Sequence, residues 1–256
     1  MLFATLPSLL LAAATGALAT QTFSNTGQKS GWDQVYTENK GTVEDITNIP
    51  YKGATALKMT QTWDPNWSGR FHSEVFHYNA YKKGDTGFYG FAFRLQESWE
   101  FNPQSYNLAQ FITDFSDLNC GEDSMPSSMV FIEGDQIGTR VKYGNVCPTQ
   151  DQKTTYFRGL KTVTPGVWHK VVIQASWRSD STGFYKMWYD GEKVTENYNL
   201  ATTVTDGRAF QFRVGLYANS WHDDPEGYTG NQPFRQVWFD QIGIGSEFKD
   251  ADPDQW

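Results

Sequence analysis

Three ionisable side chains alternate along one short segment of the chain. In GRFHSEVF, residues 69–76, every second position from Arg70 onward holds Arg70, His72 and Glu74. If the segment is a β-strand, these side chains share one face, because strand side chains alternate with a period of two. A cation, an imidazole and a carboxylate in one row can neutralise charge and transfer protons, so the segment indicates acid–base chemistry.

A second segment places an arginine and a tyrosine on one face. In FQFRVGLYAN, residues 210–219, Arg213, Gly215 and Tyr217 alternate with apolar side chains that are expected to face the core. The glycine between the two polar residues is expected to leave room for a ligand. The segment NLAQFI adds Gln110, although its expected face also holds leucine and isoleucine. These side chains outline one polar site on a sheet.

The segment TGFYGFAFRLQ, residues 86–96, separates into an aromatic face and a face of small residues that ends in Arg94. We expect the aromatic face to belong to the core. The opposite face is predicted to form the floor of a groove, with Arg94 contacting the ligand.

The set of residue types disfavours glycoside hydrolysis and suits β-elimination. Hydrolases need two carboxylates around the scissile bond, and the E-x-D-x-x-E strand of sandwich-fold glucanases is absent. In β-elimination from a uronic-acid polymer, a base removes the C5 proton and an acid protonates O4. Arg, Gln and His can neutralise the carboxylate and fixed donors can hold the intermediate, while Tyr or His moves the proton. This chemistry requires no cofactor.

Stereochemistry allows one residue to act as base and then as acid. In a β-D-glucuronate or mannuronate unit, the C5 hydrogen and O4 lie on the same side of the ring. Tyr217 suits this role if positive charge lowers its pKa from about 10, and Arg213 is the expected source of that charge. His72 as base, with Tyr217 as acid only, is the alternative. Arg70 and Glu74 either form a structural ion pair or shape the site.

Strand-like segments dominate the rest of the chain. They are short, rich in β-branched and aromatic residues, and separated by Gly, Asn, Asp and Pro. No long segment keeps an apolar period of 3.6 residues. This pattern predicts an all-β, single-domain antiparallel β-sandwich, a concanavalin-like jelly roll with one sheet bent around a concave substrate groove.

The first residues and the composition set the compartment and the partners. Residues 1–19 are apolar and end in Ala-Leu-Ala, which predicts a signal peptide. No other stretch approaches the roughly 18 apolar residues that span a bilayer, so residues 20–256 are expected to form a secreted, monomeric catalytic domain away from membranes. Cys120 and Cys147 are expected to pair in an oxidising compartment. A net charge of −8 argues against nucleic acid.

Six stretches of the chain together resemble the fungal glucuronan lyases, a polysaccharide lyase family with a β-jelly-roll fold: GRFHSEVF, LAQFI, GVWHKVVIQASW, GFYKMWYDGEKV, FRVGLYANSW and FDQIGIG. The resemblance covers nearly the whole mature chain. It implies a secreted enzyme that cleaves the anionic polysaccharide glucuronan, a β-1,4-linked polyglucuronate, by β-elimination, which leaves unsaturated uronate ends. A non-catalytic carbohydrate-binding jelly roll and an alginate (mannuronate) lyase are the alternatives.

A more distant likeness connects the chain with the jelly-roll alginate lyases. Those enzymes carry three site motifs: an Arg-Glu-Arg strand, a Gln-x-His strand and a Lys-x-Gly-x-Tyr-x-Gln-like strand. The corresponding stretches here are Arg70-Phe71-His72-Ser73-Glu74, Gln110-Phe111-Ile112, and Arg213-Val214-Gly215-Leu216-Tyr217 followed by Asn219.

The second motif departs from the alginate lyase pattern. Ile112 stands where those enzymes carry histidine, which argues against an alginate lyase and leaves His72 as the replacement. Carried over by position, the resemblance assigns Gln110 and His72 to the substrate carboxylate and Tyr217 to proton transfer.

The face pattern and the resemblance together predict a substrate-binding set around the catalytic residues, with Trp221 as a sugar platform: Arg70, Glu74, Arg94, Arg213, Asn219 and Trp221. Jelly rolls of this kind often bind a structural Ca²⁺ on the side away from the groove, through a late-strand aspartate and oxygens near the N-terminus. Asp240 in FDQIGIG matches the late-strand ligand of that site, although calcium needs six to eight oxygen ligands. A solvated aspartate is the other interpretation of Asp240.

Overall fold

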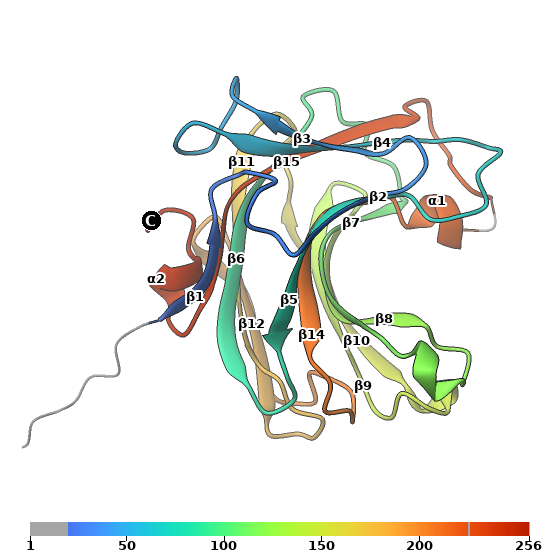
Figure 1. The fold of residues 1–256 in the computed structure, drawn as a ribbon, viewed down its shortest axis with the longest axis vertical. Coiled ribbons are helices and arrows are strands. Elements are labelled where there is room, and N and C mark those ends of the chain that lie inside the picture. The colour runs from blue at the N-terminus through green and yellow to red at the C-terminus, as the bar shows by residue number, and fades with distance from the viewer. Residues whose placement is uncertain (1–19, 225, 256) are drawn as a thin grey trace, which may run out of the picture.

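The computed structural model describes residues 20–224 and 226–255, and its strands form two antiparallel sheets that pack face to face (Figure 1). The signal peptide predicted for residues 1–19 lies outside the described residues. Within the described part of the chain, no helix has the length and apolar character to cross a membrane.

One sheet, which we call the outer sheet, has eight strands. Its order is β13-β12-β11-β6-β15-β4-β3, and β1 also pairs with β15. Its strands are β1 (Gln21–Asn25), β3 (Thr42–Ile46), β4 (Ala56–Thr62), β6 (Thr86–Leu95), β11 (Trp168–Ser176), β12 (Gly183–Tyr189), β13 (Glu192–Leu200) and β15 (Phe234–Gly245).

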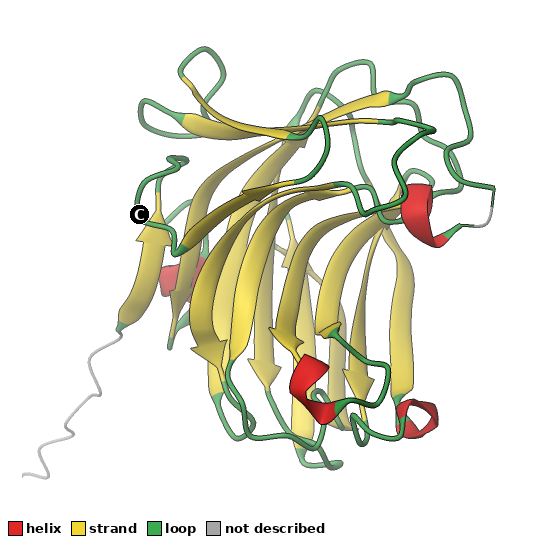
Figure 2. Ribbon diagram, turned by 45° about the vertical axis from the view of Figure 1, so that its right-hand side comes forward, coloured by secondary structure: helices red, strands yellow, loops and turns green. Residues whose placement is uncertain are grey.

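The other sheet, which we call the groove sheet, has seven strands in the order β10-β9-β8-β7-β14-β5-β2. Its strands are β2 (Gln34–Thr37), β5 (His72–Tyr81), β7 (Ser105–Asp114), β8 (Ser124–Glu133), β9 (Gln136–Tyr143), β10 (Lys153–Thr162) and β14 (Phe210–Tyr217). The remaining elements are single turns: η1 (Ser116–Leu118), η2 (Thr149–Asp151), α1 (Ser220–Asp223) and α2 (Phe248–Ala251). Figure 2 shows both layers curving together.

Apolar side chains from the facing sides of both sheets form one core. Phe91 of β6 packs against Phe212 of β14, with ring centroids 6.4 Å apart, and Phe212 stacks on Phe111 of β7 at 4.9 Å. Because side chains alternate along each strand, the core takes one face of each sheet and leaves the other for polar groups. The core faces predicted for β6 and β14 are confirmed, since their alternate apolar residues are buried in this cluster.

The groove predicted on the second face of β6 is wrong. That face is the outside of the outer sheet, where α2 covers it: a Cβ added to Gly90 would lie 2.1 Å from the carbonyl oxygen of Ala251. The rings of Phe88 and Phe248 also meet there, at 6.1 Å. The small residues of β6 therefore let the C-terminal turn approach the sheet and do not accommodate a ligand.

Irregular pairing brings the polar residues of the groove sheet to one face. The pairing of β7 with β8 shifts register between Asn107 and Ala109, and such a bulge inserts one residue into a strand. As a result Asn107 and Gln110, which strict alternation would place on opposite faces, both line the groove, while Leu108 joins the core. The bulge explains why Gln110 could not be placed from periodicity.

Gly215 permits the close approach of two site strands. A Cβ at this position would lie 2.3 Å from the carbonyl oxygen of Ser73 and 2.6 Å from the Cα of Glu74. The space that we expected to hold a ligand is therefore occupied by the backbone of β5. Glycine is needed there for packing β14 against β5.

Several strands escaped the sequence pattern, and one pairing was predicted. Strands β1, β2, β3 and β10 were not predicted, and GFYKMWYDGEKV is two strands, β12 and β13, that turn at Asp190 and Gly191, both with positive φ. The predicted disulfide between Cys120 and Cys147 is present. It ties the loop before β8 to the loop after β9 at one end of the groove sheet.

Candidate active site

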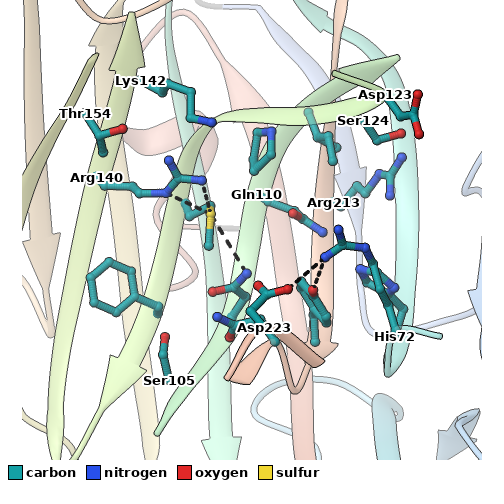
Figure 3. A pocket seen from close by; sticks show the side chains of 18 of the residues that line it. His72, Ser105, Gln110, Asp123, Ser124, Arg140, Lys142, Thr154, Arg213 and Asp223 are labelled. Carbon is teal, nitrogen blue, oxygen red and sulfur yellow. Dashed lines mark hydrogen bonds and ion pairs between the residues drawn. The ribbon is translucent and has the colours of Figure 1, made fainter. Parts of the chain in front are cut away.

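The concave face of the groove sheet carries a large cavity of about 920 Å³. Strands β2, β5, β7, β8, β9, β10 and β14 all contribute to its lining, and a close view is given in Figure 3. Six of the predicted residues line it: Arg70, His72, Gln110, Arg213, Tyr217 and Asn219. Segments separated by more than a hundred residues thus supply one polar surface.

Tyr217, the last residue of β14, lies on this surface against His72 and Arg70. The Tyr217 and His72 residues are directly paired across β14 and β5, and their rings stack with centroids 3.9 Å apart. Nη1 of Arg70 donates a hydrogen bond of 2.6 Å to the Tyr217 hydroxyl. The phenol and the imidazole therefore reach the cavity from the same side, next to a fixed positive charge.

The electrostatic surroundings of Tyr217 differ from the prediction. Burial, followed by the negative charge of Asp223, raises the pKa of Tyr217 above its usual value, and the charge of Arg70 offsets only part of this rise. The expected neighbour, Arg213, instead lies over the ring of Phe76 at 3.7 Å. In the free protein Tyr217 is therefore a protonated phenol, and Arg70 rather than Arg213 is its cationic partner.

Glu74 is buried beneath the cavity and does not pair with Arg70. Nε2 of Gln110 donates a 2.7 Å hydrogen bond to Oε1 of Glu74, while Nη1 of Arg213 lies 3.8 Å from its Oε2. Nη1 of Arg70 instead lies 3.2 Å from Oδ1 of Asp223, a residue of the short helix α1. The possible Arg70–Glu74 ion pair is thus absent, and Glu74 orients Gln110 through its hydrogen bond while lying near the charge of Arg213.

Sequence reasoning missed the partner of His72. Nδ1 of His72 lies 2.6 Å from Oε2 of Glu38, which follows β2, and the hydroxyl of Tyr36 donates a 2.9 Å hydrogen bond to the same carboxylate. Although burial opposes it, the hydrogen bond from His72 helps to hold the pKa of Glu38 below its usual value. The other ring nitrogen, Nε2, lies 3.9 Å from Oε2 of the buried Glu74, so the imidazole stands between two carboxylates while its ring lines the cavity. No motif in the sequence linked Glu38 to this strand.

Two asparagines present unsatisfied polar atoms in the same region. Oδ1 of Asn107 and Oδ1 of Asn219 are buried and form no hydrogen bond. Asn107 is paired with Tyr217 across β7 and β14, and both asparagines line the cavity. Buried polar groups are normally hydrogen-bonded, so these amides are suited to a polar ligand. Asn219 was predicted, whereas Asn107 was hidden by the bulge in β7.

Two predicted substrate-binding residues lie elsewhere. Arg94 is on β6 of the outer sheet, where its Nη2 pairs with Glu97 at 2.9 Å. Trp221 is only 2 % exposed and packs edge-on against Phe71, with centroids 5.2 Å apart. Trp221 is therefore part of the core below α1 and offers no sugar platform. Tyr156 of β10, which is 46 % exposed, is an aromatic side chain that does line the cavity.

Asp240 lies on β15, away from the groove. Its carboxylate accepts hydrogen bonds from the backbone N–H groups of Tyr51, Lys52 and Gln241 at 2.7–3.0 Å. Burial nevertheless raises the pKa of Asp240. The carbonyl oxygen of Thr55 approaches the same place beside Gly27. The described residues contain no group of three His, Cys, Asp or Glu side chains that could hold a metal, so other ligands would be carbonyl oxygens or water.

Comparison with known proteins identifies the family. The family model described as polysaccharide lyase matches residues 24–243. The chain belongs to the polysaccharide lyases. No curated protein matches the chain.

Solved structures add detail to this assignment. The crystal structure of the endo-β-1,4-glucuronan lyase from the fungus Trichoderma reesei is 52 % identical, with a TM-score of 0.90 over 93 % of this chain and 100 % of that one. An alginate lyase from Aplysia kurodai is 11 % identical, with a TM-score of 0.57 over 90 % and 100 %. The cellulose-induced protein Cip1 is 14 % identical, with a TM-score of 0.53 over 88 % and 97 %. The last two share only the fold with this polysaccharide lyase, whose jelly-roll sandwich agrees with the prediction.

Proposed function

We propose that this polysaccharide lyase cleaves β-1,4-linked glucuronan by β-elimination. The stacked pair of Tyr217 and His72 supports the proposal most directly, because an acid and a base lie side by side in the lining of one cavity. Elimination from a β-D-glucuronate unit needs a base and an acid on the same side of the ring. The similarity to the Trichoderma reesei glucuronan lyase supports the same substrate.

The proton steps follow from the surroundings of the two rings. Tyr217 is protonated, since burial raises its pKa, and it donates its proton to the departing O4. Arg70 then stabilises the phenolate through the hydrogen bond that it already makes. Nε2 of His72, whose other nitrogen is held by Glu38, removes the C5 proton. Tyr217 regains a proton as His72 releases one.

The substrate carboxylate must be neutralised before the C5 proton can leave. Gln110 and Asn107 lie on β7 next to β14, and the N–H groups of their amides, on Nε2 of Gln110 and Nδ2 of Asn107, are the donors that we assign to this carboxylate. The unpaired Oδ1 of Asn107 can accept only from a donor such as a sugar hydroxyl. Gln110 is oriented by Glu74. Neutral donors that are fixed before the reaction stabilise the enolate-like intermediate without reorganising, so this step needs no cofactor.

The experiment is to mix the protein with glucuronan and follow the ultraviolet absorbance of the unsaturated uronate. We expect absorbance to rise with wild-type protein and with Tyr198→Phe, a control tyrosine that is 55 % exposed on the outer sheet. Tyr217→Phe should bind the polymer and lose turnover. No rise on glucuronan, or a rise only on polymannuronate, would overturn the substrate assignment.

The pH profile tests the division of roles. If Tyr217 had to ionise before acting as the base, the rate would climb about tenfold per pH unit between neutral pH and about pH 9. We expect no such climb, because the protonated phenol is the acting form. A tenfold climb would assign both proton steps to Tyr217.

We also propose secretion as a monomer and calcium binding at Asp240. The disulfide between Cys120 and Cys147 is consistent with an oxidising compartment. Asp240 is a buried carboxylate beside a backbone carbonyl, an arrangement that a hard cation stabilises.

A further inference from the structure

A second cationic position lies in the floor of the groove, away from Tyr217. Arg140 of β9 belongs to a row of directly paired residues that crosses the groove sheet. Arg213 pairs with Gln110, Gln110 with Met129, and Met129 with Arg140. Neighbouring strands are about 4.8 Å apart, which places Arg140 about 10 Å from Gln110. A polymer that lies across the strands at Gln110 would continue over Arg140.

The Arg140 side chain is buried without an anionic partner. It is 8 % exposed, and its Nε and Nη2 contact only the sulfur of Met129, at 2.9 and 2.7 Å. Figure 3 shows both dashed lines ending on that sulfur. A thioether is a weak acceptor for a group with five N–H donors. Within residues 20–224 and 226–255, no carboxylate lies at ion-pair distance from Arg140.

The other arginines of the groove are compensated in the free protein. Arg158 of β10 pairs with Glu133 at 2.9 Å, and Arg213 lies 3.8 Å from Glu74. A buried cation without an anion destabilises the fold. The free protein therefore keeps at Arg140 a charge that no carboxylate of the described residues neutralises and that an anionic ligand in the groove would satisfy.

Lys142 adds positive charge on the same strand. Its Nζ donates a 3.0 Å hydrogen bond to the amide oxygen of Gln152, while the nearby carboxylate of Glu122 accepts from the amide nitrogen of Gln152 at 2.8 Å. Gln152 thus stands between the lysine and the acid. Burial and the charge of Arg140 lower the pKa of Lys142, as expected where two cations share one side of a groove.

We propose that Arg140, assisted by Lys142, binds the carboxylate of a uronate unit other than the one that reacts. The guanidinium fork matches a carboxylate in two parallel hydrogen bonds. The site selects chains with a charge on successive units, so it favours polyuronates over neutral glucans. This inference rests on the proposed cleavage of a polyuronate.

The test compares Arg140→Met with Arg158→Met, which removes an exposed and paired arginine from the same groove. We expect Arg140→Met to raise the KM for glucuronan about 10- to 100-fold and to leave kcat unchanged, because the lost contact is made equally in ground and transition state. Arg158→Met should change KM much less. The thermal midpoint of Arg140→Met should equal or exceed that of the wild type.

Arg140→Lys keeps the charge without the fork and should recover part of the affinity. It also serves as the test if Arg140→Met fails to fold. The effect on KM should shrink for the shortest cleaved oligomers, which cannot reach Arg140. If Arg140→Met and Arg140→Lys both kept the wild-type KM for the polymer, the proposed carboxylate-binding site at Arg140 would be excluded. If the wild-type protein itself releases no unsaturated ends, the proposed lyase function is wrong. That result is distinct from an active enzyme whose KM does not depend on Arg140, which would exclude only the role of Arg140.

Discussion

Replacing Arg70 by glutamine should slow the reaction by weakening the stabilisation of the Tyr217 phenolate. Nη1 of Arg70 donates a 2.6 Å hydrogen bond to the phenol oxygen, and negative charge develops on that oxygen as its proton moves to O4. A hydrogen bond to a charged group contributes about 1.5–3 kcal/mol, and each 1.36 kcal/mol changes a rate about tenfold. The unscreened effect on kcat is therefore about 10- to 150-fold.

Solvent reduces this figure. The Arg70 side chain is 50 % exposed, so water screens part of its charge. We expect the lower part of the range, a fall in kcat of about 10- to 30-fold. KM should change less, because the contact strengthens mainly in the transition state.

Asp223→Asn is the matched variant, since Asp223 contacts Arg70 and its charge raises the pKa of Tyr217. Removing that charge eases formation of the phenolate, so kcat should stay level or rise. The assay is the initial rate of formation of unsaturated ends at saturating glucuronan, with thermal midpoints measured in parallel. Wild-type kcat in folded Arg70→Gln would refute the role of Arg70. An equal loss in Asp223→Asn would show that Asp223 supports the reaction instead of opposing it.

Three further changes test the supports of the site. Glu38→Ala should lower kcat about 10- to 100-fold, because the 2.6 Å contact that orients His72 is lost; Glu38→Asp should recover part of the rate, and unchanged kcat in the alanine variant would exclude this role. Gly215→Ala should lower stability by about 1–3 kcal/mol, because its Cβ would lie 2.3 Å from the Ser73 carbonyl oxygen; Gly207→Ala, with open space around it, is the control in thermal unfolding. Chelation of calcium should lower the thermal midpoint of the wild type and leave that of Asp240→Asn unchanged, whereas equal responses would remove Asp240 as a ligand.

The alternation of apolar and polar residues along a strand predicted correctly which face of that strand is buried. The apolar faces of β6 and β14 were predicted from period-two patterns, and both are buried in the core. The polar face of β14 likewise holds Arg213 and Tyr217, and both line the groove. These predictions hold because burial of apolar area fixes which face of a strand turns inward.

The same alternation could not tell which sheet carries the groove. Arg94 has the same polar, small-residue context as Arg213, yet β6 lies in the outer sheet and its second face is covered by α2. Trp221 was likewise expected to be an aromatic loop residue that contacts sugar, but its side chain is buried in the core. Burial by a distant segment leaves no local pattern, so neither misplacement was visible in the chain.

By itself the sequence determined the fold class, the disulfide and the strands that carry His72, Gln110 and Tyr217, whereas Arg70, predicted on the same strand as His72, precedes β5. Only the tertiary structure decided their partners: Arg70 meets Tyr217 and not Glu74, and Glu38 holds His72. It also brought Arg140 into line with Gln110 across β7, β8 and β9. Strand pattern is a local property set by burial, whereas register, bulges and strand order are set by pairing between distant segments. The chemistry of this site depends on contacts across strands, and those exist only once the groove sheet has formed.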